Sequence, residues 1–199
     1  MKQLILALIS GILLISCAPN NNQSMKQEQF IQLIQTRASV RQFTGEKISD
    51  EQIQTLLHCA MAAPTAMNKQ PWAFIVITDD SLLQQMGQAF PFSRCGNGAA
   101  CAFVMCGDMS KALPGEGQGF WINDVSAATE NLLLAAHAMG LGAVWTGVYP
   151  STDRTPQVQQ MLGLPENVLP MCIVPVGVPA EQPEVKNKFC EENIHYNRW

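Results

Sequence analysis

The stretch CAFVMC, Cys101–Cys106, is an uninterrupted apolar run of strand length. A strand in which every residue is apolar has both faces buried, so other layers must cover both sides of its sheet. Runs of the same kind are AFIVIT at Ala73–Thr78, the segment Ala143–Tyr149, and Met171–Val176. These four runs predict the strands of one sheet with two covered faces.

Helical segments alternate with these strands. Capping-box patterns begin two of them, at Ser24 through Gln27 and at Ser49 through Gln52, and Pro64 closes the second. The first helix is predicted to end near Thr36, and three further helices are predicted over Asp80–Phe90, Asp124–Met139 and Thr155–Gly163. The alternation predicts an α/β domain, layered in the α+β manner, with helices on both faces of the sheet.

The first residues resemble an export signal. Residues 1–16 have the pattern of a signal peptide, with an apolar core at Leu4–Ile15. The stretch Leu14–Cys17 (LISC) resembles the lipobox of bacterial lipoproteins, in which the cysteine is acylated. Residues 17–24 are mostly polar and predict a tether between membrane and domain.

The expected location depends on Cys17. Acylation of this cysteine makes the protein an exported, membrane-anchored lipoprotein that faces the periplasm or the cell surface. The alternative is a buried N-terminal helix with an ordinary cysteine, which leaves a cytoplasmic protein. With the signal peptide and tether set apart, the folded domain is expected over residues 25–199.

Charge and cysteine content narrow the classes of partner. The net charge is −4 with no block of like charges, which argues against nucleic-acid binding. Of the seven cysteines, Cys95 and Cys101 flank a glycine-rich turn, where the sequence leaves a disulfide open. No paired C-x-x-C spacing occurs and no histidine lies near Cys95 or Cys101, so no metal site is expected.

A short segment after the first helix concentrates anion-binding side chains. In TRASVRQF (Thr36–Phe43), Arg37, Ser39 and Arg41 alternate, and an extended chain points all three the same way. Two guanidiniums and a hydroxyl form a good cradle for a phosphate monoester. The alternative is that the arginines satisfy carbonyl groups at the helix end.

Four segments in order resemble the nitroreductase family. They are R-x-S-x-R-x-F at Arg37–Phe43, APTAMNKQPW at Ala63–Trp72, GLGAVWTGVYP at Gly140–Pro150, and the C-terminal stretch Val176–Trp199. The resemblance covers the chain from Met25 onward. It implies a homodimer with a mixed sheet, FMN as cofactor, and a C-terminal arm, Phe189–Trp199, that crosses onto the partner.

The resemblance also implies roles for particular residues. FMN-phosphate ligands would be Arg37, Ser39 and Arg41, with Lys186 and Lys188 on the other side. The flavin ring would meet Asn68 at its pyrimidine edge, Pro64, Thr65 and Ala66 of the partner subunit on its face, and the backbone of Trp145, Thr146 and Gly147 near N5. The alternatives are a solvated tail for the lysines, an Asx turn for Asn68, and a strand bulge for Gly147.

The function implied is oxidoreduction through flavin. No catalytic side chain is expected, because the cofactor carries the chemistry. A hydride would pass to or from a small organic or quinone-like substrate, with NAD(P)H as one donor. Phe120 and Trp121 are expected either to roof the substrate pocket or to be core aromatics. The alternative functions are a membrane-tethered electron relay without its own substrate, and a family relative with unusual flavin chemistry.

Overall fold

The computed structural model of this chain describes residues 21–199, with side chains from Lys26 onward. The predicted signal peptide (residues 1–16) and Cys17 lie outside the described residues. Helix α1 spans Asn21–Thr36 and therefore includes part of the segment that was predicted as a tether, residues 17–24. The stretch Asn21–Ser24 contains no proline or glycine, so nothing in it ends the helix.

The sheet has the strand order β1-β2-β5-β3, and β4 also pairs with β5. The strands are β1 Trp72–Ile77, β2 Cys101–Asp108, β3 Gly142–Ala143, β4 Thr146–Gly147 and β5 Val168–Gly177. All pairings among these described strands are antiparallel, which corrects the expectation of a mixed sheet. Strands buried on both faces lose the polar alternation that marks most antiparallel sheets, so their sequence does not show strand direction.

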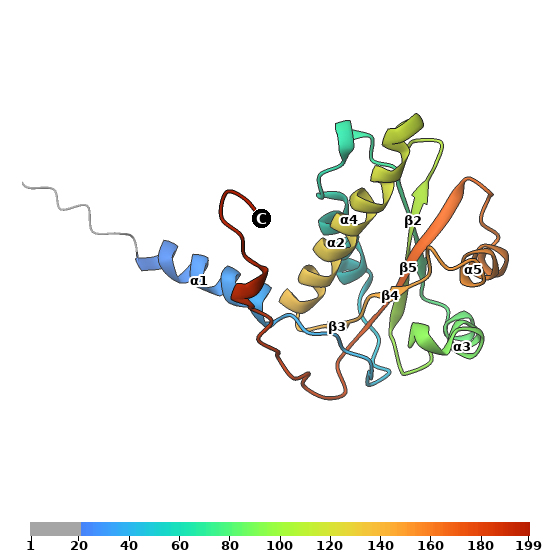
Figure 1. Cartoon of the computed structure of the whole chain (residues 1–199). Helices are drawn as coiled ribbons and strands as arrows, with labels where there is room; N and C mark the ends of the chain where they lie inside the picture. Colours follow the sequence, from blue (N-terminus) through green and yellow to red (C-terminus); the bar gives the residue numbers. More distant parts are fainter. Residues whose placement is uncertain (1–20) are drawn as a thin grey trace, which may run out of the picture.

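Helices cover both faces of the sheet, as predicted (Figure 1). On one face lie α2 (Asp50–Met61) and α4 (Phe120–Ala138), and on the other α3 (Asp80–Ala89) and α5 (Arg154–Leu162). Alternate residues of β2 enter the two cores. Cys101, Phe103 and Met105 pack with α2 and α4, while Ala102, Val104 and Cys106 pack on the side of α3 and α5. The predicted layered α/β fold is confirmed.

The strand predicted over Ala143–Tyr149 is two short strands, β3 and β4. The pairs Ala143–Val176 and Thr146–Ile173 share one register, which places Val144 opposite Pro175. Proline has no N–H, so the ladder of hydrogen bonds is interrupted there. The break lies in the segment that the family resemblance assigns to the flavin ring.

Helix α4 begins at Phe120, earlier than the predicted start at Asp124. Trp121 lies in this added turn and is 4% exposed. Its indole packs edge-on against Tyr149, with ring centroids 5.0 Å apart. Packing of this large side chain into the core holds a turn that the local glycine-rich sequence did not predict.

Helix α1 projects away from the body of the molecule, and the C-terminal segment lies beside it (Figure 1). Phe30 and Ile34 form an apolar stripe on this helix that is solvent-exposed in the single chain: Phe30 is 62% and Ile34 48% exposed. Among the described residues, no helix combines the length and the apolar character needed to cross a membrane. The stripe is therefore an apolar surface without a partner within the described chain.

Candidate functional site

The segment that follows α1 is extended and anchored at two points. The backbone N–H of Val40 donates to the carbonyl of Ala143 in β3 at 3.0 Å. Further along, the N–H of Phe43 donates to Asn97 O at 3.0 Å, and the Asn97 side chain donates to the Arg41 carbonyl at 2.9 Å. Val40 and Phe43 are buried, which leaves the polar residues between and before them free for a ligand.

The predicted phosphate ligands surround one open cavity of about 1220 Å³. Its walls are the end of α1 with the segment after it, Glu130 of α4, and residues 181–189 of the C-terminal segment. Arg37, Ser39, Arg41, Lys186 and Lys188 all line it. Residues separated by most of the chain thus meet at one place, although both lysines are exposed to solvent.

Two contacts on α4 hold the start of this segment. Glu130 Oε1 pairs with Arg37 Nε at 3.2 Å. The His137 ring lies with Nε2 at 3.0 Å from Thr36 Oγ1. Burial, and then the positive charge of Arg37, lower the pKa of His137. The Nε of Arg37 thus pairs with a side-chain carboxylate rather than with a carbonyl group at the helix end.

Arg41 is less constrained than Arg37. Its side chain is exposed, and Nη1 reaches the carbonyl oxygen of Ser39 only at 3.5 Å. A contact of this length contributes little to the position of the side chain. Arg41 is consequently free to reorient toward an anion in the cavity.

The loop that carries Asn68 is held by a buried carboxylate. Asp124 of α4 accepts a hydrogen bond from the backbone N–H of Ala66 at 2.8 Å. In and just after the 3-10 turn Ala66–Asn68, Met67, Asn68 and Gln70 have φ values of 49°, 54° and 49°, a left-handed conformation that is uncommon outside glycine. Such backbone strain is typical of ligand sites and needs a strong local anchor. Asp124 was not identified as a site residue from the sequence. The signal that could have identified it is an acidic side chain on an otherwise apolar helix face.

Within that loop, Asn68 bonds a side chain. Its Oδ1 accepts from Gln70 Nε2 at 3.1 Å, while the Gln70 N–H donates to Thr65 Oγ1, also at 3.1 Å. A side-chain partner differs from the Asx turn that the sequence left open. Pro64 and Asn68 are exposed, and Thr65 and Ala66 half-buried.

The backbone of the segment at β4 is accessible to a ligand. The Thr146 hydroxyl donates to Ile173 O at 2.6 Å, and Gly147 is exposed. A Cβ built on Gly147 would meet no atom within 4 Å, so a ligand has room to approach. The Gly147 carbonyl accepts from Arg154 Nη1 at 3.2 Å, and the Arg154 guanidinium lies 4.4 Å from the centre of the Phe92 ring. Arg154 was also missed: its partner Gly147 is seven residues away, but the ring of Phe92 is distant in sequence.

The two aromatic residues that were expected near the substrate pocket lie in different environments. Trp121 is a core residue, as the second interpretation had it, while Phe120 is 53% exposed at the start of α4. Neither lines the cavity around Arg37, and neither do residues 64–68 or 145–147. In one subunit the expected phosphate and ring residues therefore do not line one common cavity.

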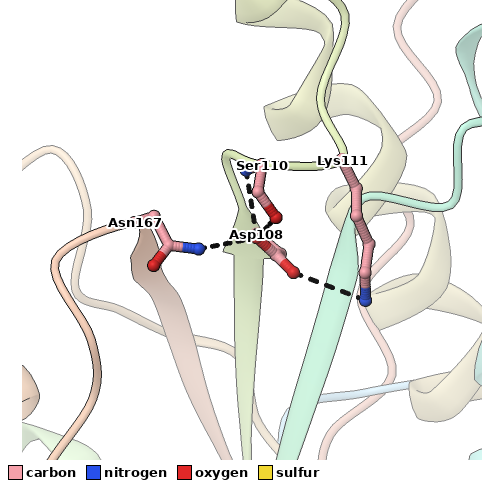
Figure 2. A network of polar contacts seen from close by, with 4 residues as sticks. All are labelled: Asp108, Ser110, Lys111 and Asn167. Carbon is pink, nitrogen blue, oxygen red and sulfur yellow. Dashed lines mark hydrogen bonds and ion pairs between the residues drawn. The ribbon is translucent and has the colours of Figure 1, made fainter.

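A carboxylate fixes the loop between β2 and α4 (Figure 2). Asp108 Oδ1 accepts from the Ser110 hydroxyl at 2.6 Å and from Asn167 Nδ2 at 2.9 Å, and Oδ2 pairs with Lys111 Nζ at 3.4 Å. The hydroxyl of Ser110 is the main cause that lowers the pKa of Asp108. These contacts tie the start of this loop to the end of the sheet.

The cysteines form no disulfide among the described residues. Cys95 and Cys101 are buried free thiols, and burial raises the pKa of Cys95 to about 11 and of Cys101 to about 12. Such thiols are unreactive at neutral pH. Within residues 26–199, no group of three or more His, Cys, Asp or Glu side chains could hold a metal ion.

The fold is thus a layered α/β domain, and four basic and three acidic side chains line the cavity at its edge. The Nitroreductase family model matches residues 34–91 and 94–178. The chain belongs to the nitroreductase family, as the four sequence segments predicted.

Individual relatives agree with this assignment. A protein of Archaeoglobus fulgidus, provisionally named NADH dehydrogenase/NAD(P)H nitroreductase, is 40% identical over 175 residues, covering 86% of this chain and 99% of that protein. The crystal structure of a similarly named protein from Parabacteroides distasonis has a TM-score of 0.80 at 41% identity, covering 86% of this chain and 99% of that chain. NADPH:FMN oxidoreductase of Vibrio harveyi, solved with NAD+, has a TM-score of 0.76 at 30% identity, covering 85% of this chain and 77% of that chain.

Proposed function

We propose that this protein is an FMN-dependent oxidoreductase that moves a hydride between NAD(P)H and a small organic or quinone-like substrate. The observation that carries the proposal is the gathering of Arg37, Ser39, Arg41, Lys186 and Lys188 around one cavity. The membership of the chain in the nitroreductase family, with a relative whose name specifies NADPH and FMN, supports this choice of cofactor and donor.

The chemistry of this donor set fits the FMN phosphate. Guanidiniums bind phosphate oxygens bidentately, and the lysines add compact charges from the opposite wall. Ser39 can donate its hydroxyl to a further oxygen. FMN, when bound, accepts and releases the hydride, so the protein has to position the reactants and stabilise charge.

We propose further that the complete site needs two copies of the chain. In this arrangement Pro64, Thr65, Ala66 and Asn68 of one subunit meet the flavin ring held by the other, which accounts for their separation from the cavity. The exposed stripe on α1 and the C-terminal arm supply apolar surface for the contact: Tyr196 is 83% exposed and Trp199 fully exposed. Apolar patches of this kind mark protein interfaces.

The experiment is a titration of the purified protein, made without residues 1–17, with FMN. We expect tight binding, and a protein with Arg37→Ala and Arg41→Ala together should bind at least tenfold more weakly. Charge-assisted hydrogen bonds contribute about 1.5–3 kcal/mol each. The matched control, Lys47→Ala with Lys111→Ala, removes the same charge from two surface ion pairs outside the cavity. Failure of the wild-type protein to bind FMN in this titration would refute the proposal.

We also propose, from the sequence of residues 1–17, that the protein is exported and acylated on Cys17. Labelling with radioactive palmitate should be lost in the Cys17→Ala protein, and absent labelling of the wild type would indicate a cytoplasmic reductase.

NADH and NADPH are not maintained outside the cytoplasm, so an exported enzyme would draw on a reduced substrate or a membrane-linked carrier. For such an enzyme, we expect NAD(P)H to bleach the flavin slowly. Bleaching at about 10 per second, an ordinary turnover rate, would contradict the proposal that the donor is not NAD(P)H.

A further inference from the structure

Three carboxylates, those of Glu130, Glu181 and Glu184, stand in the wall of this cavity. Glu130 lines the cavity together with the five proposed phosphate ligands, and it is 48% exposed. A negative charge beside a phosphate site weakens phosphate binding by direct repulsion. For Glu130, an ion pair with Arg37 offers a contribution that can compensate this repulsion.

That contribution is visible in the geometry of Arg37. The ion pair joins Glu130 Oε1 to Arg37 Nε, at 3.2 Å, and Arg37 is only 17% exposed. Nε is the inner donor of the guanidinium, so this contact fixes the plane of the group while its two Nη groups remain available. Those Nη groups form the edge that grips phosphate bidentately.

The helix that carries Glu130 is well suited to hold a side chain in place. The opposite side of α4 is locked into the core by Val125, Leu132 and Ala136, all fully buried. His137 lies seven residues after Glu130, which places both side chains on nearly the same helix face. The hydroxyl hydrogen of Thr36 is donated to Gln32 O at 2.7 Å, so the ring donates from Nε2 to Thr36 Oγ1. Two adjacent residues, Thr36 and Arg37, are thereby attached to one rigid helix.

We propose that Glu130 is a positioning residue, which orients Arg37 for the phosphate of FMN. The inference rests on the proposed function, since it takes the phosphate as the ligand of Arg37. Its consequence is that the carboxylate helps FMN binding through geometry more than it opposes binding through charge. Glu130 acts on the phosphate only through Arg37.

Three variants separate geometry from charge. Glu130→Gln keeps an oxygen that can accept from Arg37 Nε but removes the charge, whereas Glu130→Ala removes both. Glu184→Ala removes a different carboxylate of the same cavity. Each protein is titrated with FMN and with riboflavin, which lacks the phosphate, and thermal unfolding is followed in parallel.

We expect Glu130→Ala to bind FMN about tenfold more weakly, the effect of roughly one charge-assisted hydrogen bond. Glu130→Gln should bind FMN as well as the wild type or more tightly, and Glu184→Ala should bind it somewhat more tightly. Riboflavin affinity should change by less than about twofold in all three, since the phosphate contact is the one affected.

Two results would overturn the inference while leaving the cofactor in place. If Glu130→Ala binds FMN more tightly, as Glu184→Ala should, Glu130 acts through charge alone. If Glu130→Ala weakens FMN and riboflavin equally, its effect is a general loss of structure. Failure of the wild-type protein to bind FMN is a distinct result, which overturns the proposed function and this inference together.

Discussion

The carboxylate of Asp124 holds the backbone N–H of Ala66 at 2.8 Å, across 58 residues of sequence. Asp124 is 6% exposed, and this bond connects the rigid helix α4 to the strained loop at Met67–Gln70. The position of the loop that is proposed to meet the flavin ring thus depends on a core helix.

Asp124→Ala should destabilise the protein by about 1–3 kcal/mol, because a half-buried N–H loses its acceptor. Asp124→Asn keeps an acceptor oxygen and should cost less. Chemical denaturation measures both, and limited proteolysis should show cleavage near residue 67 in the alanine protein. Asp153→Ala is the control, since this exposed residue makes no capping hydrogen bond. Equal stability of Asp124→Ala and wild type would show that the bond does not hold the loop.

Gly107→Ala should also destabilise the protein, by about 1–3 kcal/mol for overpacking. A Cβ at this position in β2 would overlap the six-membered ring of Trp121. Trp121→Leu removes that ring, so the double variant should be more stable than the sum of the two single effects predicts. Strict additivity in this double-mutant cycle would mean that the two residues are not in contact.

Lowering the pH should destabilise the fold through His137. Burial and Arg37 lower its pKa in the folded protein, so below about pH 6.5 the unfolded chain binds a proton more readily. Stability should therefore decrease as the pH falls through 6.5 and should level off below the folded pKa. His137→Gln should remove this part of the pH dependence in urea unfolding between about pH 7 and pH 5. An unchanged dependence would assign it to another group.

Asp108 should affect the stability of the fold in a separate, more acidic pH range. Its pKa is lowered in the folded state, so its stabilising contribution is fully present above the unfolded value of about 3.9. This contribution is lost as the pH falls through the lower, folded pKa. Asp108→Asn should flatten acid unfolding below about pH 4 and leave the window of His137 unchanged. A flattened response near pH 6 instead would contradict this assignment.

Removal of the arm Phe189–Trp199 should weaken both the proposed dimer and FMN binding. Ile194, Tyr196 and Trp199 are apolar and exposed, and burial on a partner would be worth about 25 cal/mol per Å². Light scattering and flavin titration measure the two effects, and Tyr196→Ala with Trp199→Ala gives a milder version. A full-length monomer with complete flavin occupancy would exclude the dimer arrangement.

Local sequence was sufficient to predict most of the secondary structure and to group one set of candidate phosphate ligands. Apolar runs such as Cys101–Cys106 and the capping box at Ser49 act over a few residues, so their signals survive without knowledge of the fold. Arg37, Ser39 and Arg41 alternate within one extended segment, and alternation alone orients them together. The link to Lys186 and Lys188 came from the family resemblance.

Tertiary structure alone decided how these pieces meet. The break between β3 and β4 arises because Pro175 lies opposite Val144, a register that exists only once β5 is in place. The added first turn of α4 depends on the burial of Trp121 against Tyr149. The positions of Asp124 and Glu130 have the same origin, since each bonds a group far away in sequence. Arg154 likewise lies over the ring of Phe92, which is far away in sequence. Hydrogen bonds and ion pairs act over a few ångströms, so these partners could be known only after the sheet and helices had brought them together.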